Sequence, residues 1–567
     1  MTDEELIDQA EAAGGVSKWA KYLKMCGPGF LQSACTIGGG TLASCLFMGS
    51  IAGLSGLWIQ PIAIVLGVIV LGLIAHVTLA NDENPFHLIN RTASPVLGWG
   101  WLIATVAANM IWVLPQYNLA VGALTKNVAP GLLGGDNGKA IATIGVAVVA
   151  TAIIMLQLRG GKSARIFDRV IQVTIALIVL CFGAVVFKLL SNGDLSIGAM
   201  LSGLVPKPSL MSEPASTYTD LLAACGETKA YWSAQITSTQ KNVIFAAIGA
   251  SVGINMTFLL PYTLRDRKWG KKHMSLSKID LSVGLVIPFV LVTVFVISAA
   301  STTLHTKVDA SLTGWSFASP SETEPGQLGK YRDSLSKLAV ELNGEAFPKK
   351  PKDFEKLEKE AQEEILVAQN PYLDKISVAD RAIASATLKH GTAALAAPLK
   401  ELFGGSAGTL IFGIGVVFIA LSTILMLMLI NGYALEAAFG LPRYVGCLLV
   451  LDGVLGPFIW GKTGAYLAVP TSVIGLTLLP IAIWAFFFVA KSKKMGEHRL
   501  GGLGTVVCAV VALIYTYLSG WAAYGKIGML GPGIMIAIAI AALLTSPLVR
   551  KTPDTATDSA SSSADAE

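Results

Sequence analysis

Charged side chains are scarce in this chain of 567 residues. Asp, Glu, Lys and Arg make up 14% of the sequence, about half of the share that soluble domains carry. Apolar residues make up 53% and the mean hydropathy is +0.62, which is more apolar surface than one water-surrounded core can bury. The composition therefore indicates that lipid, not water, surrounds most of the chain.

Several sequence motifs are also missing. The seven cysteines show no metal-ligand spacing and no disulfide framework, and most lie in or beside apolar runs, where cysteine behaves as a small hydrophobic residue. No Walker A sequence is present, which argues against ATP-driven pumping, and no nucleophile–base set lies in the apolar runs, which argues against an enzyme. The basic residues occupy short loops, so the net charge of +5 gives no reason to expect nucleic acid as a partner. We expect no cofactor.

Long apolar runs recur along the chain. A spanning helix needs roughly 20 mostly apolar residues, because the hydrocarbon layer of a bilayer is about 30 Å thick. No ten-residue alternating segments typical of a β-barrel appear. The runs predict an all-α polytopic membrane protein with about 12 transmembrane helices, at 27–50, 56–80, 98–125, 139–158, 168–191, 241–262, 280–303, 406–431, 443–461, 464–490, 502–524 and 527–548.

Basic residues cluster in every second connection between these runs. Examples are Lys21 before the first span, Arg165 after the fourth, Arg265 after the sixth and Lys494 after the tenth. The positive-inside rule then puts both termini in the cytoplasm, in a multi-pass protein of the cell membrane. The first 15 residues lack the basic and apolar regions of a cleaved signal peptide, so we expect the first span to direct insertion.

Two longer polar connections fall on the opposite side. The longer of them is expected to be partly helical, because Ser377 followed by Asp380 is typical of a helix N-terminus. It is either a packed external cap or a binding lid or partner site. The predicted organisation is a cytoplasmic N-terminal segment (1–26), five spans (27–191), an extracytoplasmic loop (192–240), two spans (241–303), an extracytoplasmic helical insertion (304–405), three spans (406–490), two final spans (502–548) and a disordered cytoplasmic tail (552–567).

Glycine interrupts the first and sixth spans. The first contains Gly38, Gly39 and Gly40 before Thr41, and each glycine destabilises a helix interior by about 1 kcal/mol relative to alanine. The sixth contains its own glycines in the stretch 249–257. These spans hold equivalent positions in two five-helix halves, which is typical of inverted-repeat transporters that bind substrate between broken helices. The alternative is close helix packing by small residues.

The two breaks predict the substrate-binding residues. From the first and sixth spans we expect Gly38, Gly39, Gly40, Thr41, Ser251, Gly253, Asn255, Met256 and Thr257. The third and tenth spans are expected to supply the cavity wall, through Asn109, Gln116, Asn118, Tyr466 and Thr471. Ionisable groups inside spans are candidates for ion coupling. Asp452 and His76 are therefore either coupling residues or residues that only pack and hydrogen-bond.

Two stretches resemble a known family. The segment Cys26-Gly27-Pro28-Gly29-Phe30-Leu31 before the glycine run is similar to the first helix of the natural resistance-associated macrophage protein (Nramp) family of divalent-metal transporters. The stretch Ser422-Thr423-Ile424, followed by Asn431-Gly432-Tyr433-Ala434-Leu435-Glu436 and then Leu441-Pro442-Arg443, is similar to the end of that family's eighth helix and the start of its ninth. The resemblance implies a LeuT-like fold of two inverted five-helix repeats, and a divalent metal cation as substrate.

The chain departs from the family's metal motifs. Where the family has Asp-Pro-Gly-Asn the sequence reads Gly38-Gly39-Gly40-Thr41, and where it has Met-Pro-His-Asn the sequence reads Gly253-Ile254-Asn255-Met256. A site of carbonyl, hydroxyl and amide oxygens lacks the anionic ligands that divalent cations prefer, so the ligands of any metal are unknown. The sequence predicts a divergent relative that is a secondary-active transporter, coupled to H⁺ or Na⁺.

Two rival interpretations stay open from the sequence. One is a transporter of a small polar organic solute or an anion on the same scaffold, because helix N-termini at the breaks attract negative charge. The other is a sensor that has kept the fold and does not transport. A channel fits less well, because a selectivity filter needs a repeated loop or rings of charge. The expected partners are thus a small solute or ion and the lipid bilayer, and the oligomeric state is unknown.

Overall fold

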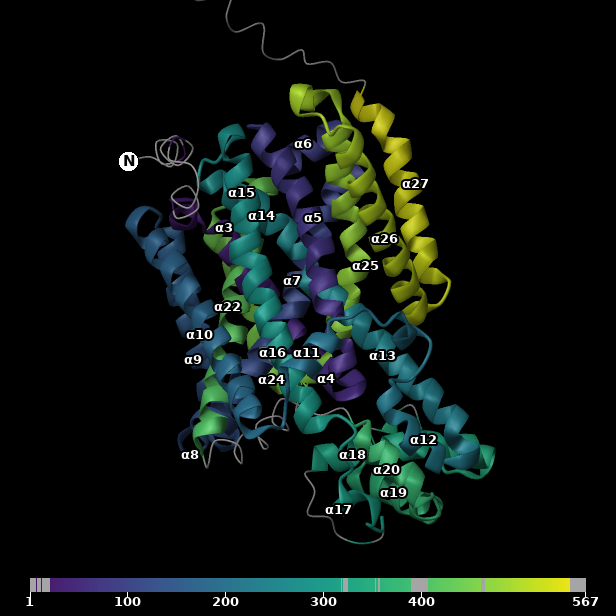
Figure 1. The fold of residues 1–567 in the computed structure, drawn as a ribbon. Helices are drawn as coiled ribbons and strands as arrows, with labels where there is room; N and C mark the ends of the chain where they lie inside the picture. Colours follow the sequence, from purple (N-terminus) through teal and green to yellow (C-terminus); the bar gives the residue numbers. More distant parts are fainter. Residues whose placement is uncertain are drawn as a thin grey trace, which may run out of the picture.

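The computed structural model describes residues 7, 12, 21–317, 319, 325–351, 353–354, 357–388, 406–459 and 464–550. The predicted tail at 552–567, most of the N-terminal segment and positions 389–405 of the insertion lie outside these residues. All regular elements in the described part are helices, and most run side by side in one bundle (Figure 1). Ten described segments are long and apolar enough to cross a membrane, and Leu530–Ser546 is a shorter apolar helix.

The helices follow the predicted spans, and the predicted all-α membrane fold is confirmed. The bundle consists of α3 (Pro28–Thr36), α4 (Gly39–Ala52), α5 (Ile59–Ala80), α7 (Pro95–Ala123), α9 (Gly135–Leu158), α10 (Gly161–Asn192), α13 (Lys229–Ser251), α14 (Ile254–Asp266), α15 (Met274–Leu281), α16 (Ile287–Leu304), α22 (Ser406–Phe439), α25 (Gly464–Lys491), α26 (Gly502–Ile527) and α27 (Leu530–Arg550). The first and sixth predicted spans are each divided into two helices. The break in the first begins at Ile37, one residue before the predicted glycine run.

The predicted ninth span is not one regular helix. It consists of α23 (Arg443–Leu449), the 3₁₀ segment η10 (Val450–Leu455) and α24 (Gly456–Ile459). Its glycines lie against neighbouring helices so closely that a Cβ at Gly446 would come within 2.1 Å of the Asn431 carbonyl oxygen. A Cβ at Gly456 would come equally close to the carbonyl oxygen of Leu114. We attribute the irregular helix geometry of this span to its close contact with α22 and α7.

Helix α13 begins at Lys229, twelve residues before the predicted start of the sixth span. This extension meets a module of short helices that Figure 1 places at the end of the bundle opposite α6 (Pro85–Thr92) and α15. The Nε1 of Trp232 on α13 donates to Asp380 Oδ1 at 2.7 Å. The module contains α12 (Thr219–Ala224), α17 (Ala310–Thr313), α18 (Pro325–Asn343), α19 (Lys359–Asp374) and α20 (Val378–Ala386), whereas α11 (Ile197–Gly203) lies beside α4 and α16.

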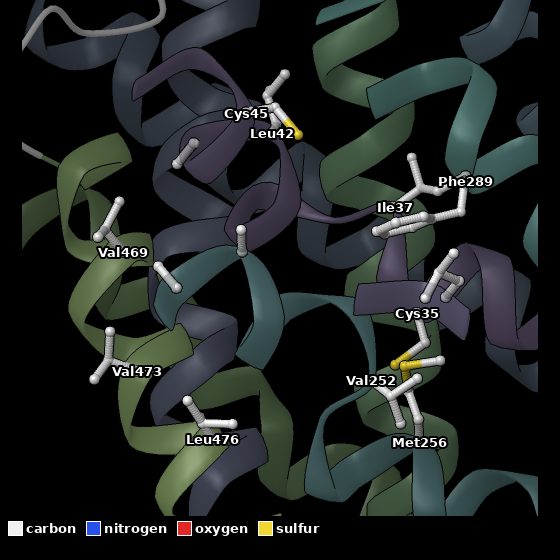
Figure 2. Close-up of a cluster of buried hydrophobic side chains, with 14 of the residues drawn as sticks. Cys35, Ile37, Leu42, Cys45, Val252, Met256, Phe289, Val469, Val473 and Leu476 are labelled. Carbon is white, nitrogen blue, oxygen red and sulfur yellow. The ribbon is translucent and has the colours of Figure 1, made fainter. Parts of the chain in front are cut away.

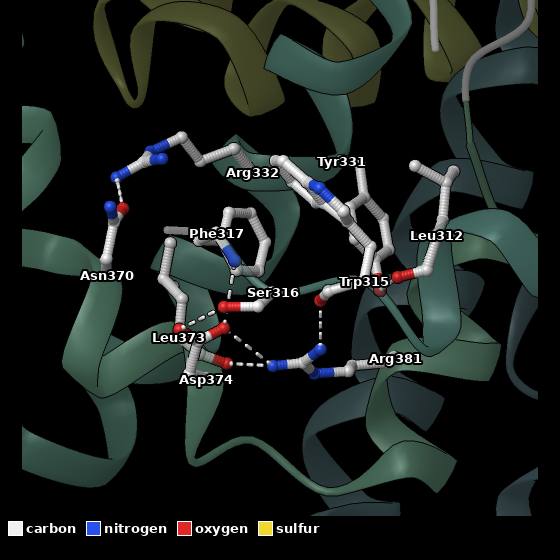
Figure 3. Close-up of polar contacts among 10 residues, drawn as sticks. All are labelled: Leu312, Trp315, Ser316, Phe317, Tyr331, Arg332, Asn370, Leu373, Asp374 and Arg381. Atoms are coloured by element: carbon white, nitrogen blue, oxygen red, sulfur yellow. Dashed lines mark hydrogen bonds and ion pairs between the residues drawn. The ribbon is translucent and has the colours of Figure 1, made fainter. Parts of the chain in front are cut away.

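The module has its own buried polar centre at Arg381 (Figure 3). Its guanidinium donates to the carbonyl oxygens of Trp315 and Leu373, at 2.7 and 2.9 Å, and pairs with Asp374 at 3.3 Å. Asp374 in turn accepts a hydrogen bond from the Phe317 amide at 3.0 Å. A buried charge needs such partners, so these contacts fix three segments of the insertion relative to one another. The insertion is thus a folded unit in the described part of the chain.

Candidate functional site

The two helix breaks lie next to each other in the bundle. Gly38 has extended backbone angles (φ −114°, ψ −174°), as has Gly253 (φ −93°, ψ 167°). The Thr36 hydroxyl at the end of α3 donates to the carbonyl oxygens of Ser251 and Ala250, at 2.6 and 2.9 Å. The first break therefore supplies hydrogen bonds to carbonyls that the second break leaves without helical partners.

A cavity of about 50 Å³ lies between the breaks. A water molecule needs about 10–15 Å³ by this measure, so the cavity has room for one ion with a few waters. Eight predicted site residues line it, namely Gly38, Gly40, Thr41, Gly253, Asn255, Met256, Gln116 and Thr471. Thr41, Asn255 and Met256 are each at most 5% exposed, so these lining side chains are buried in the bundle.

Other predicted residues support the site without lining it. The Gly39 amide donates to Gln116 Oε1 at 2.9 Å, which fixes α4 against α7. The remaining side chains bond elsewhere: the Ser251 hydroxyl to the carbonyl oxygens of Ile248 and Ala63, Thr257 with Trp101, Asn109 with Asn431, and Asn118 with the Gly456 carbonyl. Tyr466 lies on α25, but its side chain is outside the described part of the chain.

The two predicted coupling residues lie away from the cavity. The His76 Nε2 is 2.7 Å from the His498 carbonyl oxygen, in the connection between α25 and α26. Asp452 lies on η10, and its Oδ1 is buried without a hydrogen-bond partner. The hydroxyl of buried Tyr117 is unpartnered as well. An unpartnered buried carboxylate oxygen needs explanation, so Asp452 stays a candidate for ion coupling, whereas His76 has a structural partner.

Sequence reasoning missed several lining residues. They are Cys35, Thr36, Trp112, Gly249, Ala250, Thr423, Leu427 and Ser472. Thr423 belongs to a stretch that resembles the family's eighth helix, and its place there is a usable signal. Cys35 lies in an apolar run with no distinguishing neighbour, so its pattern indicates only packing.

Two sulfur atoms lie at the cavity. Cys35 comes from the last turn of α3 and Met256 from the first turn of α14, and Figure 2 shows their sulfurs pointing toward each other. The Asn255 Nδ2 donates to Cys35 Sγ at 3.3 Å. No thioether stands at the position that resembles the family's methionine, where this chain has Gly253, but the side chain of Met256 reaches the same cavity.

The described lining of the cavity carries no charged side chain. The described residues also contain no group of three or more His, Cys, Asp or Glu side chains that could hold a metal ion. The donors available are backbone carbonyls, the hydroxyls of threonine, the amides of Gln116 and Asn255, and the two sulfurs. Such a site differs from the anionic oxygen sites that hold hard divalent cations.

A carboxylate holds the start of α3 at the end of the bundle away from the module. Asp280 on α15 is fully buried and accepts hydrogen bonds from the amides of Gly27 and Gly29, at 2.7 and 2.6 Å. Arg267 pairs with Asp168 at 2.5 Å and reaches the Met25 carbonyl oxygen at 3.4 Å. These contacts keep the start of α3 in place.

A second cavity of about 40 Å³ lies toward the module. Phe47 of α4, Val243 of α13 and Val469 of α25 line it, together with Thr387 and Leu388 at the end of the described insertion. The same three helices border both cavities. Along α13, Gly249 and Val243 are nearly two turns apart, or about 9 Å.

Comparisons with known proteins agree with this architecture. A family model described as natural resistance-associated macrophage protein-like matches residues 29–316. A solved structure of a manganese transporter from Eremococcus coleocola, bound to an aromatic bis-isothiourea compound, matches with a TM-score of 0.61 and 14% identity, over 95% of this chain and 96% of that one. Two variants of that transporter match at 15% identity over the same shares, with TM-scores of 0.61 and 0.60. No curated protein sequence matches the chain.

Proposed function

The chain belongs to the natural resistance-associated macrophage protein-like (Nramp) family, and from that premise we propose that it is a secondary transporter of a metal cation. Its site is the cavity between the breaks at Ile37–Gly38 and Val252–Gly253. The observation that carries the proposal is that both breaks line one cavity of ionic size, in which extended backbone meets polar side chains.

The burial of the lining residues supports transport by alternating access. A buried site exchanges its cargo with water only when a neighbouring helix moves. Helix α3 is a suitable moving part, because it is short and its start is held by hydrogen bonds from the Gly27 and Gly29 amides to Asp280. The narrow second cavity along α4, α13 and α25 is the proposed route on the module side.

A metal cation is the cargo that family membership favours, since the similar solved structures are described as manganese transporters. The backbone carbonyls and the sulfurs of this cavity are cation ligands, whereas its described lining contains no cationic side chain to bind an anion. Coupling to H⁺ or Na⁺ through Asp452 is part of the proposal, because the Oδ1 of that carboxylate has no partner. We further propose cytoplasmic termini in the cell membrane, on the basis of the basic connections.

Uptake into proteoliposomes tests the proposal. Purified protein is reconstituted, and uptake of Mn²⁺, Mg²⁺ and monovalent metal ions is compared with uptake of small neutral and anionic solutes. Asn255→Leu removes the bonds from Asn255 to Cys35 Sγ and from the Met256 amide to Asn255 Oδ1. Saturable metal uptake is expected to fall by about tenfold or more, because two hydrogen bonds of about 1 kcal/mol each are lost at the site.

Asn192→Leu is the matched control, because it makes the same change at an exposed position at the end of α10. It is expected to leave uptake unchanged. Uptake of an organic solute or an anion, sensitive to Asn255→Leu and with no metal flux, would contradict the metal assignment. No flux of any tested solute would contradict transport itself.

A further inference from the structure

We infer that the cavity selects a soft monovalent metal ion, such as Cu⁺ or Ag⁺, with the Cys35 thiolate and the Met256 thioether as its ligands. This inference rests on the proposed function and names the cargo within it. Its starting point is that the only strong metal-binding atoms on the described cavity lining are sulfurs. Thiolate and thioether are ligands that select Cu⁺, whereas Mg²⁺ and Mn²⁺ prefer carboxylate, carbonyl and water oxygens.

The two sulfurs come from opposite sides of the site. Cys35 ends the first half of one broken helix, and Met256 begins the second half of the other. In Figure 2 both sulfurs point into the space between α3 and α14. Cys35 is 6% exposed and Met256 is 1% exposed, so bulk water does not compete for an ion held between them. Sulfur ligands on two helices also let the ion itself connect the two breaks.

Charge balance favours a monovalent ion. Binding removes the proton from the Cys35 thiol, forms the bond from sulfur to the metal, and releases that proton to water, while the metal keeps its oxidation state. A monovalent ion with one thiolate is neutral. A divalent ion would leave one net positive charge in a cavity whose described lining has no carboxylate, and an unpaired buried charge is strongly unfavourable.

A hydrogen-bond donor lies beside the Cys35 sulfur. The Asn255 Nδ2 already donates to the sulfur at 3.3 Å, and this N–H remains a donor when the thiol loses its proton. Because the ion replaces a proton on Cys35, binding at this site exchanges one ion for one proton.

Binding of Ag⁺ to the purified full chain tests the inference, because Ag⁺ is a redox-stable probe for Cu⁺. Bound silver is counted by mass spectrometry after equilibrium dialysis, at several pH values. Cys35→Ser is expected to remove one equivalent of tightly bound silver, and Met256→Leu to weaken the same equivalent by about tenfold or more. Affinity for this equivalent is expected to rise with pH, since a proton is released on binding.

Cys45→Ser is the matched control, because Cys45 is also a buried cysteine, on α4, but does not line the cavity. It is expected to keep the equivalent that Cys35→Ser loses. Met256→Leu preserves the apolar volume, so it tests the site even if Cys35→Ser does not fold. X-ray absorption of Cu⁺-loaded protein is expected to show two sulfur neighbours in the wild type and one in Met256→Leu.

The outcomes separate this inference from the proposed function. Silver binding that is unchanged in both Cys35→Ser and Met256→Leu would overturn the inference, and so would displacement of the silver by Mn²⁺ at similar concentration. Uptake of Mn²⁺ or Mg²⁺ that does not depend on Cys35 would then leave the proposed function standing. Conversely, tight silver binding at Cys35 and Met256 without any flux would support the site and contradict transport.

Discussion

His305 is a buried side chain that joins three segments near the module. Its Nδ1 is 2.9 Å from the Ser50 carbonyl oxygen, its Nε2 is 2.6 Å from the Thr217 hydroxyl, and its ring lies edge-on to Tyr218. Gly53, with φ +59°, lies so close that a Cβ there would come within 2.7 Å of the ring. Burial lowers the pKa of His305 below its usual 6.5, although the Ser50 carbonyl opposes this effect.

This lowered pKa predicts a pH-dependent stability. In the unfolded chain His305 binds its proton at higher pH than in the fold, so its contribution to stability is complete above about 6.5. The contribution is lost as pH falls from there through the lower folded pKa. The thermal unfolding midpoint of the wild type should therefore fall more steeply between about pH 7 and pH 5 than that of His305→Gln, which cannot titrate. Parallel curves for the two proteins would contradict this prediction.

At the scale of single residues, the sequence predicted part of the site. Three adjacent glycines and the polar Asn255 stand out in apolar runs, so the breaks and one of the central amides could be predicted. Cys35 could not, because an isolated thiol in an apolar run is indistinguishable from a packing residue. Asp280 could not be paired with Gly27 and Gly29 either, because more than 250 residues separate them along the chain.

One carboxylate holds the start of helix α3. Asp280 contacts both Gly27 and Gly29, and a Cβ at Gly29 would come within 2.1 Å of the Asp280 carbonyl oxygen. A carboxylate accepts with two oxygens and carries the charge that a helix N-terminus favours, whereas an amide accepts with one oxygen and is neutral. The contact is thus both tight and charge-assisted.

Asp280→Asn is expected to loosen α3. Loss of one charged hydrogen bond, worth about 1.5–3 kcal/mol, should raise the population with α3 displaced by about tenfold or more. Cys35 lies in the last turn of α3, so its alkylation by a small thiol reagent should become faster by a similar factor, as measured by mass spectrometry of the Cys35 peptide. Asp194→Asn, at an exposed position after α10, is the control and should leave the rate unchanged. An unchanged rate in Asp280→Asn would show that Asp280 does not hold α3.

The elements were predicted well where hydrophobicity alone decides them. The long apolar runs became helices, because a chain in lipid must satisfy its backbone hydrogen bonds internally. The ninth span and the start of α13 differ from the prediction for tertiary reasons. Gly446 and Gly456 bring the ninth span against α22 and α7, and Trp232 extends α13 into the module through Asp380. Neither contact leaves a local pattern in the sequence.

At the scale of the whole molecule, two cavities lie along the same three helices. The larger one lies between the breaks, and the smaller one is bordered by Val243 and by the end of the described insertion. On the proposed route along α4, α13 and α25, the cargo passes Val243. The end of the described insertion would then border the entrance of this route. The insertion would therefore affect access of the cargo to the cavity between the breaks, and not only the stability of the fold.

Val243→Trp tests whether this route carries the cargo. Val243 is 3% exposed and lines a cavity of about 40 Å³, which an indole would fill. Metal uptake should fall by about tenfold or more, while the overpacking should destabilise the fold by only about 1–3 kcal/mol. Silver binding to Cys35 at equilibrium should be retained, because the substituted position is nearly two turns from the cavity between the breaks. Val148 lies on α9 and is 61% exposed, so Val148→Trp makes the same change outside the route. Metal uptake by this control variant should be normal. Normal uptake by Val243→Trp would mean that the cargo reaches the breaks by another path, and the second cavity would then be a packing defect between the bundle and the insertion.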